Sequence, residues 1–213
     1  MDSDGTHQRR LTKTPKDEAI PAWSPDEEKI AYGTNVFFGD NPTLWLMDAD
    51  GSGHGRLAEG SWPSWSPDGK HIVYTSGEWN DQQLSIMNSD GSERHTLGMP
   101  GAGQPAWSPN GEQIAYVNDI GRDKESWDNE EIFVMNSDGS GRTRLTDIPG
   151  NDHWPPTWSP DGTRIAFTSD GKDGYGEIYV MNSDGSGLTQ LTHHPSGPLE
   201  PSPLADTFPS WRP

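Results

Sequence analysis

The sequence predicts an all-β fold, a β-propeller of four-stranded antiparallel blades with four complete blades and a split fifth. A Trp-Ser-Pro motif recurs along the chain, with spacings of 42, 42, 51 and 53 residues between Trp23, Trp65, Trp107, Trp158 and the degenerate copy at Trp211. A period of about 40 to 45 residues is typical of propeller blades. The 25 glycines and ten tryptophans recur at fixed offsets within the units, which indicates many short strands joined by tight turns.

Each unit contains the same series of expected strands. After the Trp-Ser-Pro-Asp-Gly turn comes an alternating second strand with large apolar residues at i and i+2, around 30–32, 72–74, 114–116 and 165–167. A third strand is expected around 44–47, 84–87, 132–135 and 178–181. The turn that follows is of the Asn-Ser-Asp-Gly type, whose residues tolerate positive φ. A short outer strand, as at 144–146 and 190–192, closes the unit.

The fifth unit is divided between the two ends of the sequence. Residues 208–211 match a first strand and residues 10–12 match an outer strand, but nothing matches the two strands between them. Unpaired strand edges are normally covered or paired. We therefore expect residues 1–213 to form one propeller domain, either as a fragment of a longer propeller or as a protomer that forms a homo-oligomer through open blade edges.

The residues of these units resemble a known family. The segments W-S-P-D-G, I-A-F-T-S, I-Y-V-M-N-S-D-G-S-G and Q-L-T are similar to the propeller repeats of the TolB family over nearly the whole chain. The resemblance implies a propeller fold, a protein partner as in a cell-envelope complex, and a periplasmic or extracellular location. The same repeat also accompanies peptidase domains, so the fold alone does not assign an activity.

Composition excludes several classes of partner and site. The formal net charge of −18 disfavours nucleic acid and anionic membranes, because phosphate binding needs clustered Lys and Arg. The absence of cysteine excludes disulfides and thiolate metal sites. No apolar run approaches the roughly 18 residues of a membrane span, and the N-terminus lacks the apolar stretch of a secretion signal. The chain is expected to be soluble.

Binding is expected on one face of the propeller. The Trp-Ser-Pro-Asp-Gly and Asn-Ser-Asp-Gly turns barely vary and share one face, whereas the loops leading into the first strands and those between second and third strands vary and share the other. This variable face is acidic and aromatic, which suits a basic protein segment or a sugar. The expected partner-binding residues are Glu18, Trp62, Trp79, Trp127, Asp152, His153, Trp154 and Asp206.

Some tryptophans have a structural alternative. Trp62, Trp154 and Phe208 each precede a proline at positions of the repeat that are taken as equivalent, and packing between blades is an alternative role for them. The five motif tryptophans are expected to be structural, because a residue found in every repeat reports the common architecture.

The sequence contains two candidate cation sites. Residues 48–59 match the calcium-loop spacing, with Asp48 and Asp50 at positions 1 and 3 and Glu59 at position 12. The flanking segments are β rather than helical, so a hairpin turn is the preferred interpretation. An acidic cluster of Glu18, Asp152 and Asp206 near the central channel is the second option. No metal ligand or cofactor is assigned, and calcium stays open.

Catalysis has less support than binding. The Gly-x-Ser-x-Gly elbow, the His-Glu-x-x-His zinc helix and phosphate-binding glycine loops are all absent, so no catalytic residue is predicted. The sequence predicts a non-enzymatic binding platform for a protein partner. The alternatives are a carbohydrate- or calcium-binding propeller and, with less support, a polysaccharide lyase or hydrolase using His153, His193 and His194.

Overall fold

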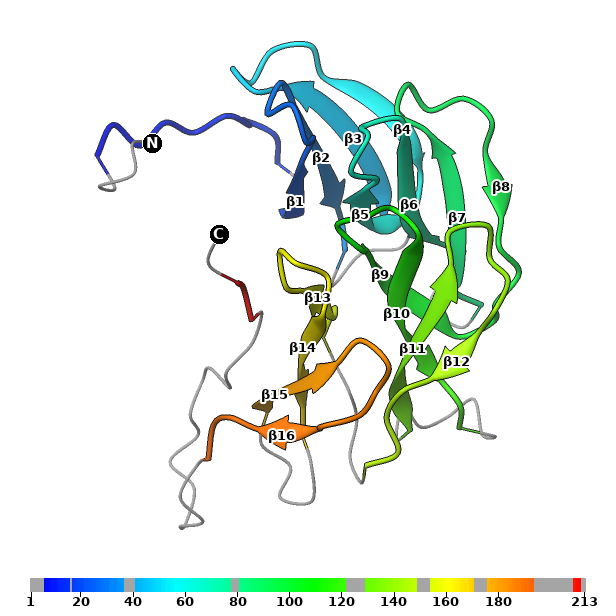
Figure 1. The fold of residues 1–213 in the computed structure, drawn as a ribbon. Coiled ribbons are helices and arrows are strands. Elements are labelled where there is room, and N and C mark those ends of the chain that lie inside the picture. Colours follow the sequence, from blue (N-terminus) through cyan, green and yellow to red (C-terminus); the bar gives the residue numbers. More distant parts are fainter. Residues whose placement is uncertain are drawn as a thin grey trace.

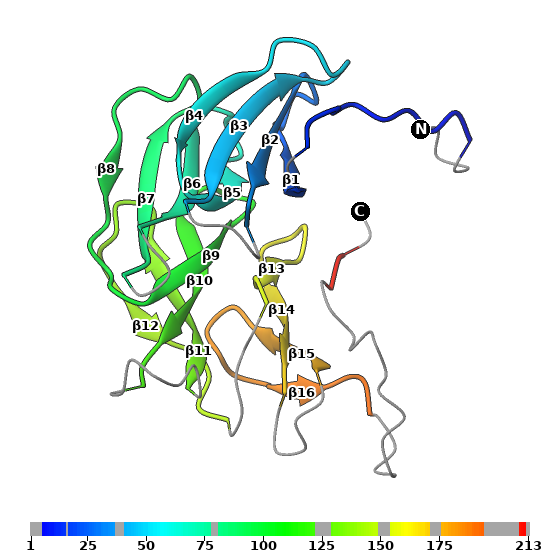
Figure 2. The same cartoon turned by 180° about the vertical axis from the view of Figure 1, so that it is seen from behind.

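The computed structural model describes residues 6–15, 17–36, 41–77, 81–121, 129–148, 154–170, 176–193 and 209–211. These residues form four antiparallel sheets of four strands each and contain no helix. The sheets follow one another around an arc, with the first strand of each inside and the fourth outside (Figure 1). The N- and C-terminal segments both lie at the open side of this arc (Figure 2). The predicted all-β propeller with four complete blades is confirmed.

The strands of each blade pair in sequence order. Blade 1 contains β1 (Glu18–Trp23), β2 (Lys29–Thr34), β3 (Thr43–Asp48) and β4 (Gly55–Glu59). Blade 2 contains β5 (Ser61–Trp65), β6 (His71–Ser76), β7 (Gln83–Asn88) and β8 (His95–Thr96). Blade 3 contains β9 (Ala102–Trp107), β10 (Gln113–Asp119), β11 (Glu130–Asn136) and β12 (Thr143–Arg144). Blade 4 contains β13 (Thr157–Trp158), β14 (Arg164–Ser169), β15 (Glu177–Asn182) and β16 (Thr189–Gln190).

The core consists of the interfaces between neighbouring blades. On β6, Ile72 and Tyr74 pack toward blade 1 in a cluster with Leu44, whereas Val73 packs toward blade 3 in a cluster with Ile114. Successive residues of a strand point to opposite faces of the sheet. A single Ile-Val-Tyr segment therefore supplies apolar side chains to two interfaces, and both faces of a middle blade are buried.

The motif tryptophans link the first strand of a blade to the first strand of the preceding blade by hydrogen bonds. Trp65 Nε1 donates a hydrogen bond to the carbonyl of Ala22 at 3.1 Å, and Trp158 Nε1 donates to the carbonyl of Ala106 at the same distance. Trp65 and Trp158 are 8% and 7% exposed, whereas Trp23, in the first of the four described blades, is 53% exposed. The predicted structural role of the motif tryptophans is confirmed for these internal junctions.

Trp211 makes the same indole hydrogen bond, whereas Trp107 bonds the preceding first strand through its backbone. Trp211 Nε1 donates to the carbonyl of Thr157 at 3.1 Å, so residues 209–211 dock on blade 4 as a further first strand would. Trp107 instead donates its backbone N–H to Ser64 Oγ at 3.1 Å. Its buried indole Nε1 has no hydrogen-bond partner among the described residues.

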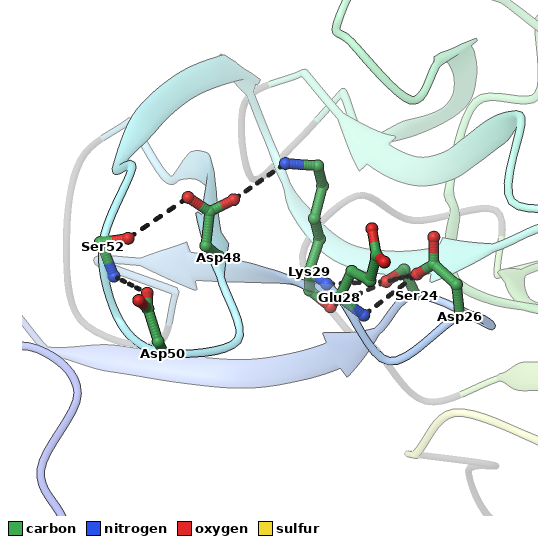
Figure 3. Close-up of polar contacts among 7 residues, drawn as sticks. All are labelled: Ser24, Asp26, Glu28, Lys29, Asp48, Asp50 and Ser52. Atoms are coloured by element: carbon green, nitrogen blue, oxygen red, sulfur yellow. Dashed lines mark hydrogen bonds and ion pairs between the residues drawn. The ribbon is translucent and has the colours of Figure 1, made fainter.

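The Trp-Ser-Pro-Asp-Gly turns are closed by a serine and the carboxylate two residues later. In blade 1, Ser24 Oγ donates to Asp26 Oδ1 at 2.5 Å and accepts the N–H of Lys29 at 2.9 Å (Figure 3). The backbone N–H of Glu28 also donates to Asp26 Oδ1. Hydrogen bonds of this kind stabilise the ionised carboxylate. The serine hydroxyl and the backbone N–H two residues after the aspartate accordingly lower the pKa of Asp68 and of Asp161 to about 2.

The outer strands are shorter than the sequence predicts. Strands were expected at 144–146 and 190–192, but β12 and β16 end at Arg144 and Gln190. In blade 3, Thr146 Oγ1 accepts the N–H of Ile132 at 2.8 Å and donates to Glu131 Oε2 at 2.5 Å. Because this side chain bonds the backbone N–H of β11, the regular ladder stops before Thr146.

The tryptophan hydrogen bond should contribute measurably to stability. Replacing Trp158 by Phe removes the hydrogen bond to the carbonyl of the half-buried Ala106, and a hydrogen bond of this kind contributes about 0.5–1.5 kcal/mol. We expect Trp158→Phe to lower the free energy of unfolding by that amount in dilute urea titrations. Trp23→Phe, the matched control at an exposed position, should change it by less than about 0.5 kcal/mol. Equal effects of the two substitutions would contradict this role.

Acid should weaken the turns. The folded pKa of Asp68 and Asp161, about 2, lies below the unfolded value of about 3.9, so their contribution is complete above about pH 4 and is lost as the pH falls toward 2. Asn110 fills the same position in blade 3 and accepts the same serine hydrogen bond. The double variant Asp68→Asn/Asp161→Asn should therefore fold and lose less stability between pH 4 and pH 2 than the wild type. An identical pH slope in urea unfolding would rule out these carboxylates as the cause.

Candidate functional site

The variable face contains the second connection of each blade and the link to the next blade. Within a blade the order β1-β2-β3-β4 is antiparallel, so these connections lie opposite the Trp-Ser-Pro-Asp-Gly turns. The innermost strands β1, β5, β9 and β13 follow one another around the centre of the arc (Figure 1). Residues at the beginning of these strands therefore gather on the variable face near the axis.

The innermost strands are bulged at one repeated position. Ile20, Trp62 and Gln104 each lie three residues before the motif tryptophan and have φ values of 54–56°. The pairing register shifts at this point in β1, β5 and β9. A left-handed conformation costs a non-glycine residue roughly 1–2 kcal/mol, and a bulge re-aims the side chain beside it. The bulge is a property of the repeat, and the side chain that it presents differs from blade to blade.

Trp62 and Trp154 meet across the inner end of the propeller. Trp62 lies in β5 of blade 2, and Trp154 lies in the segment that leads into β13 of blade 4. Their ring centroids are 6.3 Å apart with an interplanar angle of 55°, and both residues are half-buried. Blade 3 separates their blades in the sequence, so this contact is not one between adjacent sheets. The structure brings together two of the predicted site residues.

The equivalence that the sequence suggested for these two tryptophans is wrong. Trp62 lies three residues before Trp65, but Trp154 lies four residues before Trp158, where Pro155 takes the bulge position. The pair therefore joins two different positions of the repeat. The ring contact joins blades that are not adjacent, and the alternative role of packing between adjacent blades stays a prediction for Trp62 and Trp154.

Gln104 is a candidate that the sequence interpretation missed. It occupies the bulge position of blade 3, between the blades that carry the tryptophan pair, and its N–H donates to Thr75 Oγ1 at 2.9 Å. Its side-chain oxygen is buried and accepts no hydrogen bond from the described residues, and the same holds for Asn118 Oδ1. The sequence signal was available, because Gln104 lies at the same offset from its motif tryptophan as Trp62.

Glu18 is held at the beginning of β1. Its carboxylate accepts a hydrogen bond from Thr14 Oγ1, and its backbone pairs with Thr34 of β2. Burial raises the pKa of Tyr32 above its usual value, and the negative charge of Glu18 adds to the rise. Glu18 therefore supplies negative charge at the inner end of blade 1, but no contact of it with the tryptophan pair is recorded among the described residues.

The remaining predicted site residues lie outside the described part of the chain. These are Trp79, Trp127, Asp152, His153 and Asp206, with Phe208 and His194. Their roles, including the cation cluster of Glu18 with Asp152 and Asp206, stay predictions.

The loop with calcium-like spacing is a hairpin turn. Asp48 Oδ1 pairs with Lys29 Nζ at 2.9 Å, and Asp50 Oδ1 accepts the N–H of Ser52 at 2.8 Å (Figure 3). Glu59 pairs with Arg56 at 3.1 Å. The carboxylates thus bond groups of their own blade. Over all described residues, no group of three or more His, Asp or Glu side chains is placed to hold a metal ion.

Comparison with known proteins identifies the family. The sequence matches the model of the TolB beta propeller domain over residues 1–126 and again over 40–207, whereas no curated protein matches it. TolB from Acinetobacter baumannii superposes with a TM-score of 0.72 at 20% identity, covering 90% of this chain and 47% of that one. A protein assigned as TolB from Agrobacterium tumefaciens gives 0.69 at 21% identity, covering 86% and 83%.

An enzyme shares the same architecture. An oligogalacturonate lyase solved in complex with manganese gives a TM-score of 0.58 at 21% identity, covering 78% of this chain and 48% of that one. The chain thus spans about half the length of the Acinetobacter protein and of the lyase. Within the described residues, no helix has the length and apolar character needed to cross a bilayer. Repeat, blade architecture and family match agree, and the chain belongs to the TolB β-propeller family.

Proposed function

We propose that this propeller is a non-enzymatic binding platform that recognises a protein partner on its variable face, centred on Trp62 and Trp154. The observation that carries the proposal is the contact between these two rings, 6.3 Å apart, from blades that are not neighbours. Aromatic side chains supply large contact area with little conformational entropy to lose, and they dominate binding energy at protein interfaces.

Two other features of the chain favour a segment rich in N–H donors. The buried Gln104 oxygen lacks a donor among the described residues, and a buried acceptor without a partner is costly. The chain carries a net charge of −18, which attracts basic segments. A peptide supplies backbone N–H groups that can donate to the Gln104 oxygen. Its Lys or Arg side chains are attracted to the negatively charged chain.

A sugar fits the pair less well. Pyranose rings stack on a flat, open aromatic face, but the Trp62 and Trp154 rings are tilted by 55° relative to each other. Carbohydrate binding is the alternative function, because the oligogalacturonate lyase has the same fold at 21% identity. Fold alone does not transfer an activity.

Contact between the two rings should be detectable as energetic coupling. Edge and offset aromatic pairs contribute about 0.5–1.5 kcal/mol beyond buried area. In a double-mutant cycle of Trp62→Ala, Trp154→Ala and the double variant, we expect a coupling of this size in the free energy of unfolding. Strictly additive effects in urea titrations would show that the rings do not form a single unit.

Peptide and glycan binding can be compared on one immobilised sample. We expect a random peptide library to yield binders rich in Lys and Arg, and Trp62→Ala/Trp154→Ala to weaken them at least about tenfold, which is about 1.4 kcal/mol. Lys70→Ala, an exposed control in a turn on the opposite face, should leave affinity unchanged. Glycan-array binding without peptide binding, or peptide affinity unaffected by the double variant, would contradict the proposal.

A further inference from the structure

Blade 2 contains a cleft at the end of its sheet that adjoins the Trp-Ser-Pro-Asp-Gly and Asn-Ser-Asp-Gly turns. Its volume is about 460 Å³, and it is lined by His71, Ile86, Met87, Asn88, Glu93 and His95. His71 begins β6, Asn88 ends β7 and His95 begins β8. β8 lies on the outside of the arc (Figure 1). The cleft is therefore peripheral and lies opposite the variable face.

The histidines of the cleft are directed toward blade 3. Side chains that pair across antiparallel strands, or lie two apart along one strand, share a face of the sheet. His71 lies two residues before Val73 on β6, and Val73 pairs with Ile86 on β7. Ile86 in turn pairs with His95 on β8. Because Val73 packs in a cluster with Ile114 of blade 3, both histidines lie on that side of the sheet.

Glu93 occupies a position that is glycine in the other blades. Its counterparts Gly53, Gly141 and Gly187 have φ values of 64–67°, and Glu93 has a φ of 54°. A left-handed conformation costs a non-glycine residue stability, and such residues cluster at binding and active sites. Glu27 also takes a glycine position, with a φ of 60°, in a turn of blade 1. The strain at Glu93 therefore supports a site only together with the cleft that this residue lines.

The two histidines are found at these positions in blade 2 alone. Lys29, Gln113 and Arg164 fill the position of His71 in the other blades, and Gly55, Thr143 and Thr189 fill that of His95. A residue with a role in the common architecture recurs in every blade, as the motif tryptophans do. The repeat therefore does not require histidine at either position, and the combination of two imidazoles with a carboxylate belongs to this cleft.

Hydrogen bonds within blade 2 leave the cleft rich in acceptors. His95 Nδ1 lies 3.2 Å from the carbonyl oxygen of Glu93, and because a carbonyl only accepts, Nδ1 carries the proton and Nε2 of the neutral ring is an acceptor. Asn88 Nδ2 donates to Ser92 Oγ at 2.9 Å, which leaves the Asn88 side-chain oxygen as an acceptor. Among the described residues, no partner is recorded for the carboxylate of Glu93 or the imidazole of His71.

We propose that this cleft binds a guanidinium group on an aliphatic stem, such as an arginine side chain. A guanidinium presents five N–H donors in a planar fork, so it bonds the Glu93 carboxylate together with His95 Nε2 or the Asn88 oxygen. Ile86, which is 7% exposed, provides apolar surface for the methylene groups of the stem. This site is independent of the partner proposed for the variable face.

A metal ion fits the cleft less well. Zinc takes histidine and carboxylate ligands at about 2 Å, but no three His, Asp or Glu side chains of the described residues are placed to hold an ion. His71 and His95 lie on β6 and β8 with β7 between them, which puts their strands about 10 Å apart. An arginine side chain can extend along part of this distance, whereas a single ion cannot.

Titration with capped amino acids tests the ligand. N-acetyl-arginine methylamide carries the guanidinium and no other charge, and N-acetyl-citrulline methylamide is its neutral counterpart of similar shape. We expect the arginine compound to shift the NMR signals of the His71 and His95 rings, with a dissociation constant on the order of a millimolar for a ligand of this size. The citrulline compound should bind at least about tenfold more weakly, because it lacks the charge-assisted hydrogen bond to Glu93.

Glu93→Gly is the decisive variant, because it restores the residue of the other blades. Loss of the carboxylate should weaken binding of the arginine compound at least about tenfold, while relief of the left-handed strain should keep or raise the melting temperature. Glu27→Gly is the matched control, since it removes the same charge and a similar strain from a turn outside the cleft. Its affinity should stay within about twofold of the wild type.

Three results would overturn the inference. These are ring signals that do not respond to the arginine compound, equal affinity for the citrulline compound, and unchanged affinity of the Glu93→Gly variant. Zn²⁺ alone, at a concentration equal to that of the protein, should leave the signals of both rings in place. Joint shifts of the two rings with Zn²⁺ would identify a metal site and contradict the proposal.

Discussion

Burial of sheet faces between neighbouring blades is the constraint on which the rest of the structure depends. Chain regions outside these interfaces contribute little apolar burial among the described residues, because the four clusters of the core run between blades or under residues 6–15. A blade therefore behaves as a repeat that stabilises, and is stabilised by, the units beside it. In β6, Ile72 and Tyr74 pack against one neighbouring blade and Val73 packs against the other, so one short strand contributes to two interfaces.

This constraint divides the connections into two kinds. The turns on one face hydrogen-bond their own side chains, as Ser24 does with Asp26 and Asp50 with Ser52, so their sequences are fixed by local geometry. The opposite connections differ from blade to blade in length and sequence. We propose recognition at their residues, Trp62 and Trp154 among them, while the blades hold the backbone in place. Family membership fixes the scaffold and leaves the partner to the variable side chains.

Repetition explains how much the sequence could predict. Tryptophan and alternating apolar positions recur in every unit, so strands, turns and the structural role of Trp65 and Trp158 followed from the pattern. The bulge did not, because residues as different as Ile20, Trp62 and Gln104 take a positive φ there, and tertiary packing rather than residue type imposes it. The contact between Trp62 and Trp154 depends on the curvature of the whole arc, which no local pattern encodes. The early end of β12 depends on a competing hydrogen bond to Thr146.

Hydrogen–deuterium exchange of the backbone amides tests the central constraint most directly. If neighbouring blades stabilise each sheet, the amides of β6 and β10, in the two middle blades, exchange most slowly, and protection falls toward β1 and β16 at the ends of the arc. Equal protection of all four blades, or slower exchange in blades 1 and 4, would show that each sheet is stable without its neighbours and would contradict the account.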